Sequence, residues 1–117
     1  MIKFENKITN AIFRELVGLG LKKTVCTYQY MGERVGIPYQ HDAMGEFLGE
    51  ISEYFYENYG VLITVLIVKS DTGKPGDGLA NLAWNLNHPN INNPNFYQTE
   101  RDATFKLLKK LQKKGEV

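Results

Sequence analysis

The sequence contains one cysteine, Cys26, and two histidines among its 117 residues. A single thiol excludes a disulfide within the chain and is typical of a reducing compartment, so we expect a cytoplasmic protein. Neither histidine belongs to a Cys-x-x-Cys or His-Glu-x-x-His pattern, and the Gly-x-x-x-x-Gly-Lys-Ser/Thr spacing of a phosphate-binding loop is absent. We therefore expect no enzyme, no metal and no cofactor. His88, which precedes Pro89, is expected at the surface.

Long apolar segments are also lacking. The longest nearly continuous one, residues 61–68, is far shorter than the roughly 20 residues needed to cross a bilayer. The N-terminus has neither the apolar stretch nor the cleavage site of a signal peptide. The sequence thus predicts neither secretion nor a membrane partner.

A strong net charge is missing too, but the charges are unevenly distributed. The net charge is +1, which gives no global signature of a nucleic-acid-binding protein. Residues 41–60 contain acids but no lysine or arginine, whereas residues 103–117 contain five lysines and one acid. Hydrophobic residues make up 43% and charged residues 23% of the chain, as in a folded globular domain. We expect a single domain over residues 1–117.

Hydrophobic periodicity predicts an α+β fold that is mostly helical. The expected helices cover residues 3–18, 28–35, 41–58, about 79–86 and about 100–113. We also expect a short strand over 24–27 and a strand over 61–68 that is covered on both faces. Gly18 and Gly20 should end the first helix, and Thr99 with Asp102 should form a capping box at the start of the last one.

The order of these elements is that of a winged helix-turn-helix. Helix 28–35, a turn, helix 41–58, a strand and a glycine-rich turn follow one another, which predicts such a core over about 24–78 and a helical extension over 79–117. In this arrangement the second helix enters the major groove and the wing touches the backbone. The predicted phosphate and groove contacts are Tyr28, Gln40, His41, Lys69 and Lys74.

Residues 27–38, Thr-Tyr-Gln-Tyr-Met-Gly-Glu-Arg-Val-Gly-Ile-Pro, resemble the second-helix segment of O6-alkylguanine-DNA alkyltransferases and alkyltransferase-like proteins. That segment opens with Ser/Thr-Tyr and ends at Gly-x-Pro. The resemblance covers residues 27–73 and implies a winged-helix DNA-binding region. It also implies the loss of alkyl transfer, because the family's Pro-Cys-His-Arg motif falls on residues 63–66, Ile-Thr-Val-Leu. Asp42 stands where the family inserts an arginine into the base stack, and only Tyr28, matching the tyrosine that rotates a phosphate, is retained.

Residues 66–78, Leu-Ile-Val-Lys-Ser-Asp-Thr-Gly-Lys-Pro-Gly-Asp-Gly, carry a second resemblance. They are similar to a signature, Leu-Val-Val-Asn-Lys-x-Thr-Gly-x-Pro-Gly-x-Gly-Phe, of small bacterial and mobile-element proteins. This resemblance implies no established activity.

The helix expected over 41–58 carries acids opposite its apolar stripe, at Glu46, Glu50, Glu53 and Glu57. Facing DNA, these acids would meet the phosphates with the wrong sign. They leave three interpretations open: only the first turn of the helix touches DNA, the acidic face binds a protein, or the face is merely solvated and lies toward the basic last helix. Our leading hypothesis is a non-enzymatic module that binds nucleic acid. The alternative is a phage or mobile-element protein that binds a host protein through the four glutamates. The sequence leaves homo-oligomerisation open.

Overall fold

The computed structural model of the chain describes residues 1–38 and 41–117, and the side chains of all of these except 41–43. The elements are α1 (Lys7–Leu21), β1 (Cys26–Thr27), α2 (Tyr28–Val35), α3 (His41–Tyr59), the 3-10 helix η1 (Ile63–Leu66), β2 (Ile67–Val68), α4 (Asp77–Asn85) and α5 (Phe96–Lys113). The strands β1 and β2 pair in parallel, with Cys26 opposite Ile67. The predicted α+β class, rich in helix, is confirmed. No helix in the described part of the chain is long and apolar enough to span a membrane.

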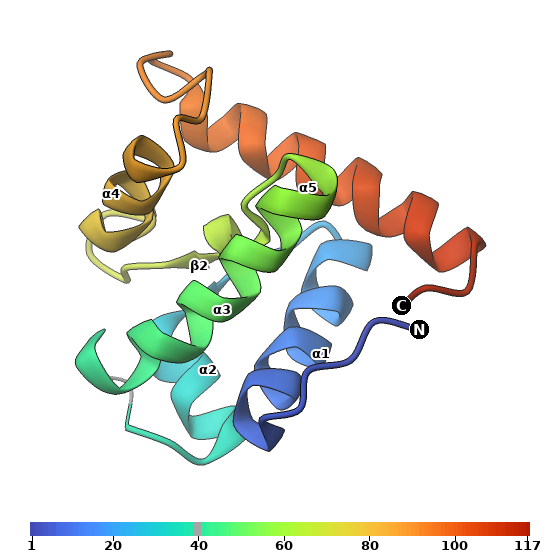
Figure 1. Cartoon of the computed structure of the whole chain (residues 1–117). Coiled ribbons are helices and arrows are strands. Elements are labelled where there is room, and N and C mark those ends of the chain that lie inside the picture. The colour runs from blue at the N-terminus through green and yellow to red at the C-terminus, as the bar shows by residue number, and fades with distance from the viewer. Residues whose placement is uncertain (39–40) are drawn as a thin grey trace.

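The helices surround the short central segment of η1 and β2 (Figure 1). Helices α1 and α3 pack against each other and against η1, α5 packs against η1 and α1, and α4 follows the turn after β2. The two ends of the chain lie side by side (Figure 1), where the Ile2 amide donates to the Glu116 carbonyl at 2.8 Å.

The central segment is buried but is not the continuous strand that its sequence predicts. All residues from 62 to 68 are buried, which confirms that the segment is covered on both faces. Residues 63–66, however, form a 3-10 helix. The reason is that the backbone groups here find other partners: the Val65 amide donates to the Leu62 carbonyl at 3.1 Å, and the Leu62 amide donates to the Glu100 carboxylate at 2.9 Å.

The expected end of the first helix at Gly18 and Gly20 is wrong. Both glycines lie inside α1, which continues to Leu21. Gly20 sits where α1 meets α5, because a Cβ at Gly20 would lie 2.1 Å from the Cδ1 atom of Leu108. The glycine therefore permits a close helix contact and does not stop the helix.

Helix α2 has a local cap at each end, whereas the capping box predicted for α5 is wrong. The Thr27 hydroxyl accepts from the Tyr30 amide at 3.1 Å, and Gly36 ends α2 in the left-handed conformation with φ 78°. Helix α5 begins at Phe96, four residues before the expected start near 100. The capping box of Thr99 and Asp102 is therefore absent, and the Asp102 carboxylate accepts instead from the Gln98 side chain at 3.1 Å.

The segment after β2 forms a tight turn. The Lys69 amide donates to the Lys74 carbonyl at 2.8 Å, and the Gly73 amide donates to the Lys69 carbonyl at 2.8 Å. We call this segment the 69–74 turn. The chain then enters α4, and the sheet of the described residues consists of the parallel pair β1–β2 alone. The turn occupies the wing's place in the chain without an antiparallel hairpin, so the winged helix-turn-helix stays a prediction.

Candidate functional site

A pocket of about 680 Å³ is lined by the first half of α3 and the start of α4. Its walls are largely apolar, with Met44 and Leu48 from α3 and Leu79 from α4. Gly45 and Gly49 widen it, because a Cβ added to either would meet no atom within 4 Å. Its volume lies in the range of small-molecule sites, roughly 300–1,000 Å³. We call it the apolar pocket.

Two buried hydroxyl groups line the apolar pocket. The Ser52 Oγ and Thr64 Oγ1 atoms lie 2.6 Å apart and form one hydrogen bond. Each hydroxyl carries one hydrogen, and a single bond between them uses only one of the two. The second hydrogen has no acceptor among the described residues. The buried wall of the pocket can therefore donate a hydrogen bond to a guest.

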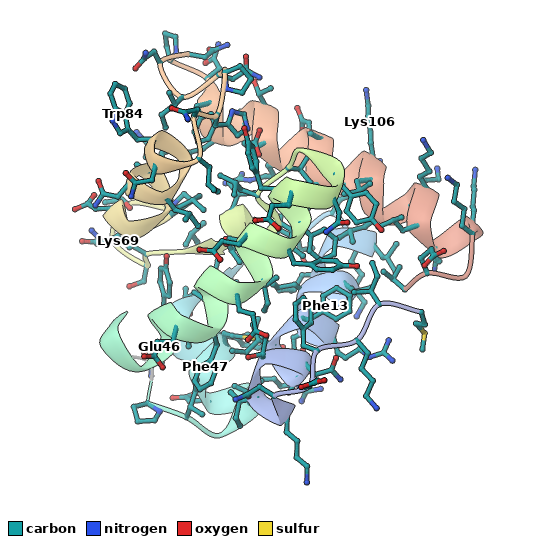
Figure 2. All side chains as sticks on the ribbon, viewed as in Figure 1. Phe13, Glu46, Phe47, Lys69, Trp84 and Lys106 are labelled. Carbon is teal, nitrogen blue, oxygen red and sulfur yellow. The ribbon has the colours of Figure 1, made fainter. Side chains whose placement is uncertain are left out.

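Tyr28 lines the same pocket and is held in place by Gly76, the residue before α4. Its hydroxyl oxygen accepts from the Gly76 amide at 3.0 Å. Burial raises the pKa of the Tyr28 phenol above its usual range, so the hydroxyl keeps its proton near neutral pH. Lys69 also lines the pocket and is exposed; Figure 2 shows it at the outer edge of the molecule, beside α4. The fixed aromatic ring of Tyr28 and the cation of Lys69 thus line the same pocket.

The residues predicted to contact nucleic acid fall into two groups. Tyr28 and Lys69 line the apolar pocket, and Lys74 belongs to the 69–74 turn that begins at Lys69. Gln40 and the side chain of His41 lie outside the described residues. The described part of the predicted interface therefore gathers on one side of the molecule.

The acidic face of α3 points away from this side. All four of its glutamates, Glu46, Glu50, Glu53 and Glu57, are exposed, and none lines the apolar pocket. At 3.6 residues per turn, the centre of the acidic face lies about 140° around α3 from the residues that line the pocket. The Glu50 carboxylate accepts from the Thr9 hydroxyl at 3.1 Å.

The acidic face has no basic partner in the described part of the molecule. No described lysine or arginine forms an ion pair with any of the four glutamates. In Figure 2, Glu46 near the start of α3 lies well away from Lys106 on α5, so this glutamate does not face the basic last helix.

The prediction of a surface His88 is wrong. The His88 ring is buried, with its Nε2 atom 2.6 Å from the Glu100 Oε1 atom, and its Nδ1 atom accepts from the Asn90 amide at 3.1 Å. Because an amide only donates, Nδ1 must be the acceptor, which assigns the ring hydrogen to Nε2. The other Glu100 oxygen accepts from the Leu62 amide. This cluster is a structural link between α5, η1 and the loop after α4.

Sequence reasoning missed Glu100, although a signal exists. Glu100 precedes Thr104, Leu108 and Leu111 at steps of four, four and three residues, so it lies in line with the buried stripe of α5. A charge in that line indicates a buried partner. Among the described residues, no group of three or more His, Cys, Asp or Glu side chains is placed to hold a metal ion.

Comparisons of the chain with protein families, with curated proteins and with solved structures find no match. The resemblance to alkyltransferase-like proteins therefore stays a prediction. The function is inferred from the apolar pocket, its polar groups and the charges around it.

Proposed function

We propose that this protein is a non-enzymatic binding module that takes single-stranded nucleic acid on the side of the apolar pocket. One base enters the pocket, while Lys69 and Lys74 contact phosphates. One observation carries the proposal: Tyr28 and Lys69 meet at an apolar pocket on a side of α3 that bears none of its exposed glutamates.

The chemistry of the pocket suits a base. Stacking of a base on an aromatic ring contributes about 1–3 kcal/mol, and the bond from the Gly76 amide fixes the Tyr28 ring before the ligand arrives. The apolar walls accept the remaining surface of the base, and the free hydrogen of the Ser52–Thr64 pair can bind a carbonyl or ring nitrogen at its edge.

A single strand suits this pocket better than a duplex. Taking a base out of a duplex costs a few kcal/mol. In the alkyltransferase family an inserted arginine compensates for the extruded base, but Asp42 stands at the matching position here. A carboxylate cannot take over that role, because it repels the neighbouring phosphates. The module therefore binds bases that are already unstacked.

Fluorescence anisotropy with a labelled thymine oligonucleotide and its duplex tests the proposal. We expect the single strand to bind more tightly. Two phosphate contacts should give a slope of about −1.4 in a plot of log K against log salt concentration. Lys69→Gln combined with Lys74→Gln should bring that slope close to zero.

Lys106→Gln combined with Lys109→Gln is the matched control, since it removes the same charge from the exposed face of α5. It should leave the slope unchanged. The absence of binding at low salt, or tighter binding of the duplex, would overturn the proposal.

A second candidate function is a protein interaction through the acidic face of α3. The observation that favours it is the exposure of all four glutamates without a described cationic partner. The partner that fits this face is a basic protein surface, of the kind that itself binds nucleic acid. Reversing charges on this face separates the two candidates, as described below.

A further inference from the structure

The outer side of α4 and the loop after it form a surface without formal charge. Residues 78–99 contain no aspartate, glutamate, lysine or arginine, and the one histidine among them, His88, is buried. Seven asparagines of this stretch are exposed, Asn81 and Asn85 on α4 among them. A surface of this kind offers no charge to a phosphate, but its amide groups both donate and accept hydrogen bonds.

Trp84 lies on this surface and has little part in the packing of the protein. Its side chain is 63% exposed, although tryptophan is on average a highly buried residue. It belongs neither to the core nor to the half-buried apolar side chains that pack against the core. On α4 it stands between Asn81, one helical turn earlier, and Asn85, the next residue. The flat face of the indole is therefore available to a ligand.

The 69–74 turn connects this surface to the apolar pocket. A second hollow, of about 440 Å³, is lined by Lys74 from the turn and by Ala80 from α4. Trp84 follows Ala80 by one helical turn, and Cβ atoms four residues apart on a helix lie about 5–6 Å from each other. Lys69, at the other end of the turn, lines the apolar pocket. Figure 2 shows Lys69 and Trp84 both at the outer edge of the molecule, beside α4.

We infer that Trp84 is a stacking platform for a second base of the strand whose first base occupies the apolar pocket, so the inference rests on the proposed function. Trp84 comes two positions after Leu82, which lines the pocket, and therefore points about 200° away from it around the helix. The strand bends around the start of α4, where Lys69 and Lys74 contact its phosphates. Asp77, the acid at this end of α4, lies in the first helical turn, where the helix dipole offsets its charge.

The chemistry around Trp84 suits an unstacked base. Every base has a flat face that stacks on an aromatic ring, which makes such a platform tolerant of sequence. The edge of a base carries donors and acceptors, and the amides of Asn81 and Asn85 match both kinds of group. The lack of charge over residues 78–99 leaves the phosphates to the lysines of the turn. A base is favoured over a protein partner because this surface continues the proposed nucleic-acid interface.

The fluorescence of Trp84 provides the test, because Trp84 is the only tryptophan of the chain. Thymidine monophosphate serves as a probe with a single base. The second probe is a thymine oligonucleotide of about eight nucleotides, within the range of roughly 4–16 that small single-strand-binding domains cover. Excitation at the long-wavelength edge of the indole band avoids absorption by thymine.

We expect the oligonucleotide to quench the Trp84 emission, with the same midpoint as in the anisotropy titration. Saturating thymidine monophosphate, which fills only the apolar pocket, should leave the emission unchanged. Trp84→Ala should weaken binding of the oligonucleotide at least about fivefold without changing the affinity for thymidine monophosphate, and Trp84→Phe should retain most of the affinity. Tyr30→Ala is the matched control and should have no effect, since Tyr30 is an aromatic residue of α2 that is 48% exposed and lines neither hollow.

The failure of this inference is distinguishable from the failure of the proposed function. If the oligonucleotide binds but neither quenches Trp84 nor loses affinity in Trp84→Ala, the inference is overturned and the proposed function stands. Equal losses for both probes in Trp84→Ala would show that Trp84 acts on the pocket through the fold, which also overturns the inference. An emission that changes when the protein alone is diluted would show that a second copy covers the indole, with the same consequence. If the oligonucleotide does not bind at low salt, the proposed function is wrong and the inference fails with it.

Discussion

Around His88 and Glu100 the protein satisfies its buried polar atoms from within, whereas around the 69–74 turn it leaves some of them without partners. His88 uses both ring nitrogens and Glu100 uses both carboxylate oxygens. On the other side, the Ser52–Thr64 pair keeps a spare hydrogen and the Arg101 Nε–H has no described partner. The hydroxyl pair lines the apolar pocket, whereas the Arg101 Nε atom is enclosed by protein.

The difference distinguishes buried polar groups that hold the fold together from buried polar groups that are free to bind a ligand. A fully paired buried cluster holds elements together and has nothing left to offer a ligand. An unpaired buried donor costs about 1–3 kcal/mol of stability, and a ligand that supplies the missing acceptor recovers that cost. Glu100 and Arg101 are adjacent in α5, yet the first is fully paired and the second keeps an unpaired donor.

The largest expected effect comes from breaking the paired cluster. Glu100→Ala removes the acceptor of the His88 ring and of the Leu62 amide. Each buried donor left without an acceptor costs about 1–3 kcal/mol, so we expect the free energy of unfolding to fall by about 2–5 kcal/mol. Arg101→Gln removes no described hydrogen bond and removes an unpaired donor, so it should lower the free energy of unfolding by no more than about 1 kcal/mol through lost packing. Urea unfolding followed by circular dichroism measures both. Equal losses from the two substitutions would contradict the comparison.

A second prediction concerns Cys26, which is buried in β1. Burial, with a smaller contribution from the negative charge of Glu15, raises the pKa of the Cys26 thiol from 9.0 to about 11. Because the thiolate is the reactive form, iodoacetamide at pH 8 should modify the folded chain about a hundredfold more slowly than the urea-unfolded chain.

The same pKa shift fixes the sign of a pH effect on stability. The raised pKa in the folded state stabilises the fold below pH 9, and this contribution is lost between about pH 9 and 11.

Mass spectrometry of timed samples measures the alkylation of Cys26 by iodoacetamide. Equal rates in the folded and unfolded chains would show that the thiol is open to solvent.

A third prediction compares a glycine in the core with glycines in open space. Gly20→Ala forces a Cβ against Leu108 in the core, and overpacking of this kind costs about 1–3 kcal/mol. Gly49→Ala faces the apolar pocket, where a Cβ meets no atom within 4 Å, so the higher helix propensity of alanine should stabilise the fold by about 0.5–1 kcal/mol. Gly18→Ala, in open space on α1, should behave like Gly49→Ala. A comparable loss at Gly49 in urea unfolding would mean that the pocket is filled.

The smallest expected effect comes from the acidic face. Glu53→Lys combined with Glu57→Lys should change the affinity for a single-stranded oligonucleotide less than about threefold, because both residues point away from the pocket and charges more than about 8 Å apart are screened at physiological salt. Lys69→Glu combined with Lys74→Glu should weaken binding at least tenfold. Anisotropy titrations measure both. A tenfold gain from the first pair would show that the glutamates face the nucleic acid and would favour a protein as their natural partner.

Elements with local signals could be predicted from the sequence. The bounds of α2 follow from the Thr27 cap and from Gly36, and the apolar stripe of α3 gives nearly its whole length. The errors have causes that are remote in the sequence. Gly20 looks like a helix stop until Leu108 is seen beside it. Residues 63–66 look like a strand because they are mostly apolar. Their apolar character, however, reflects burial from all sides and not pairing in a sheet.

The candidate site was predictable in part for the same reason. Tyr28 and Lys69 could be named because a motif order placed them near each other, and the structure brings both to the apolar pocket. The surroundings of Glu100 and Arg101 depend on which side of α5 meets the loops before it. The burial of His88 makes this residue the partner of Glu100. It could not be predicted from the sequence, because the asparagine-rich loop around His88 gives no local signal of burial.

Occlusion of the apolar pocket tests the central claim most directly. Gly49→Leu places a side chain in the pocket from α3 and should leave the unfolding midpoint unchanged or higher, because leucine is the better helix former. Gly18→Leu is the same substitution outside the pocket. The account predicts that Gly49→Leu weakens binding of a labelled single-stranded oligonucleotide at least tenfold and that Gly18→Leu does not. Unchanged affinity in a folded Gly49→Leu protein would contradict it.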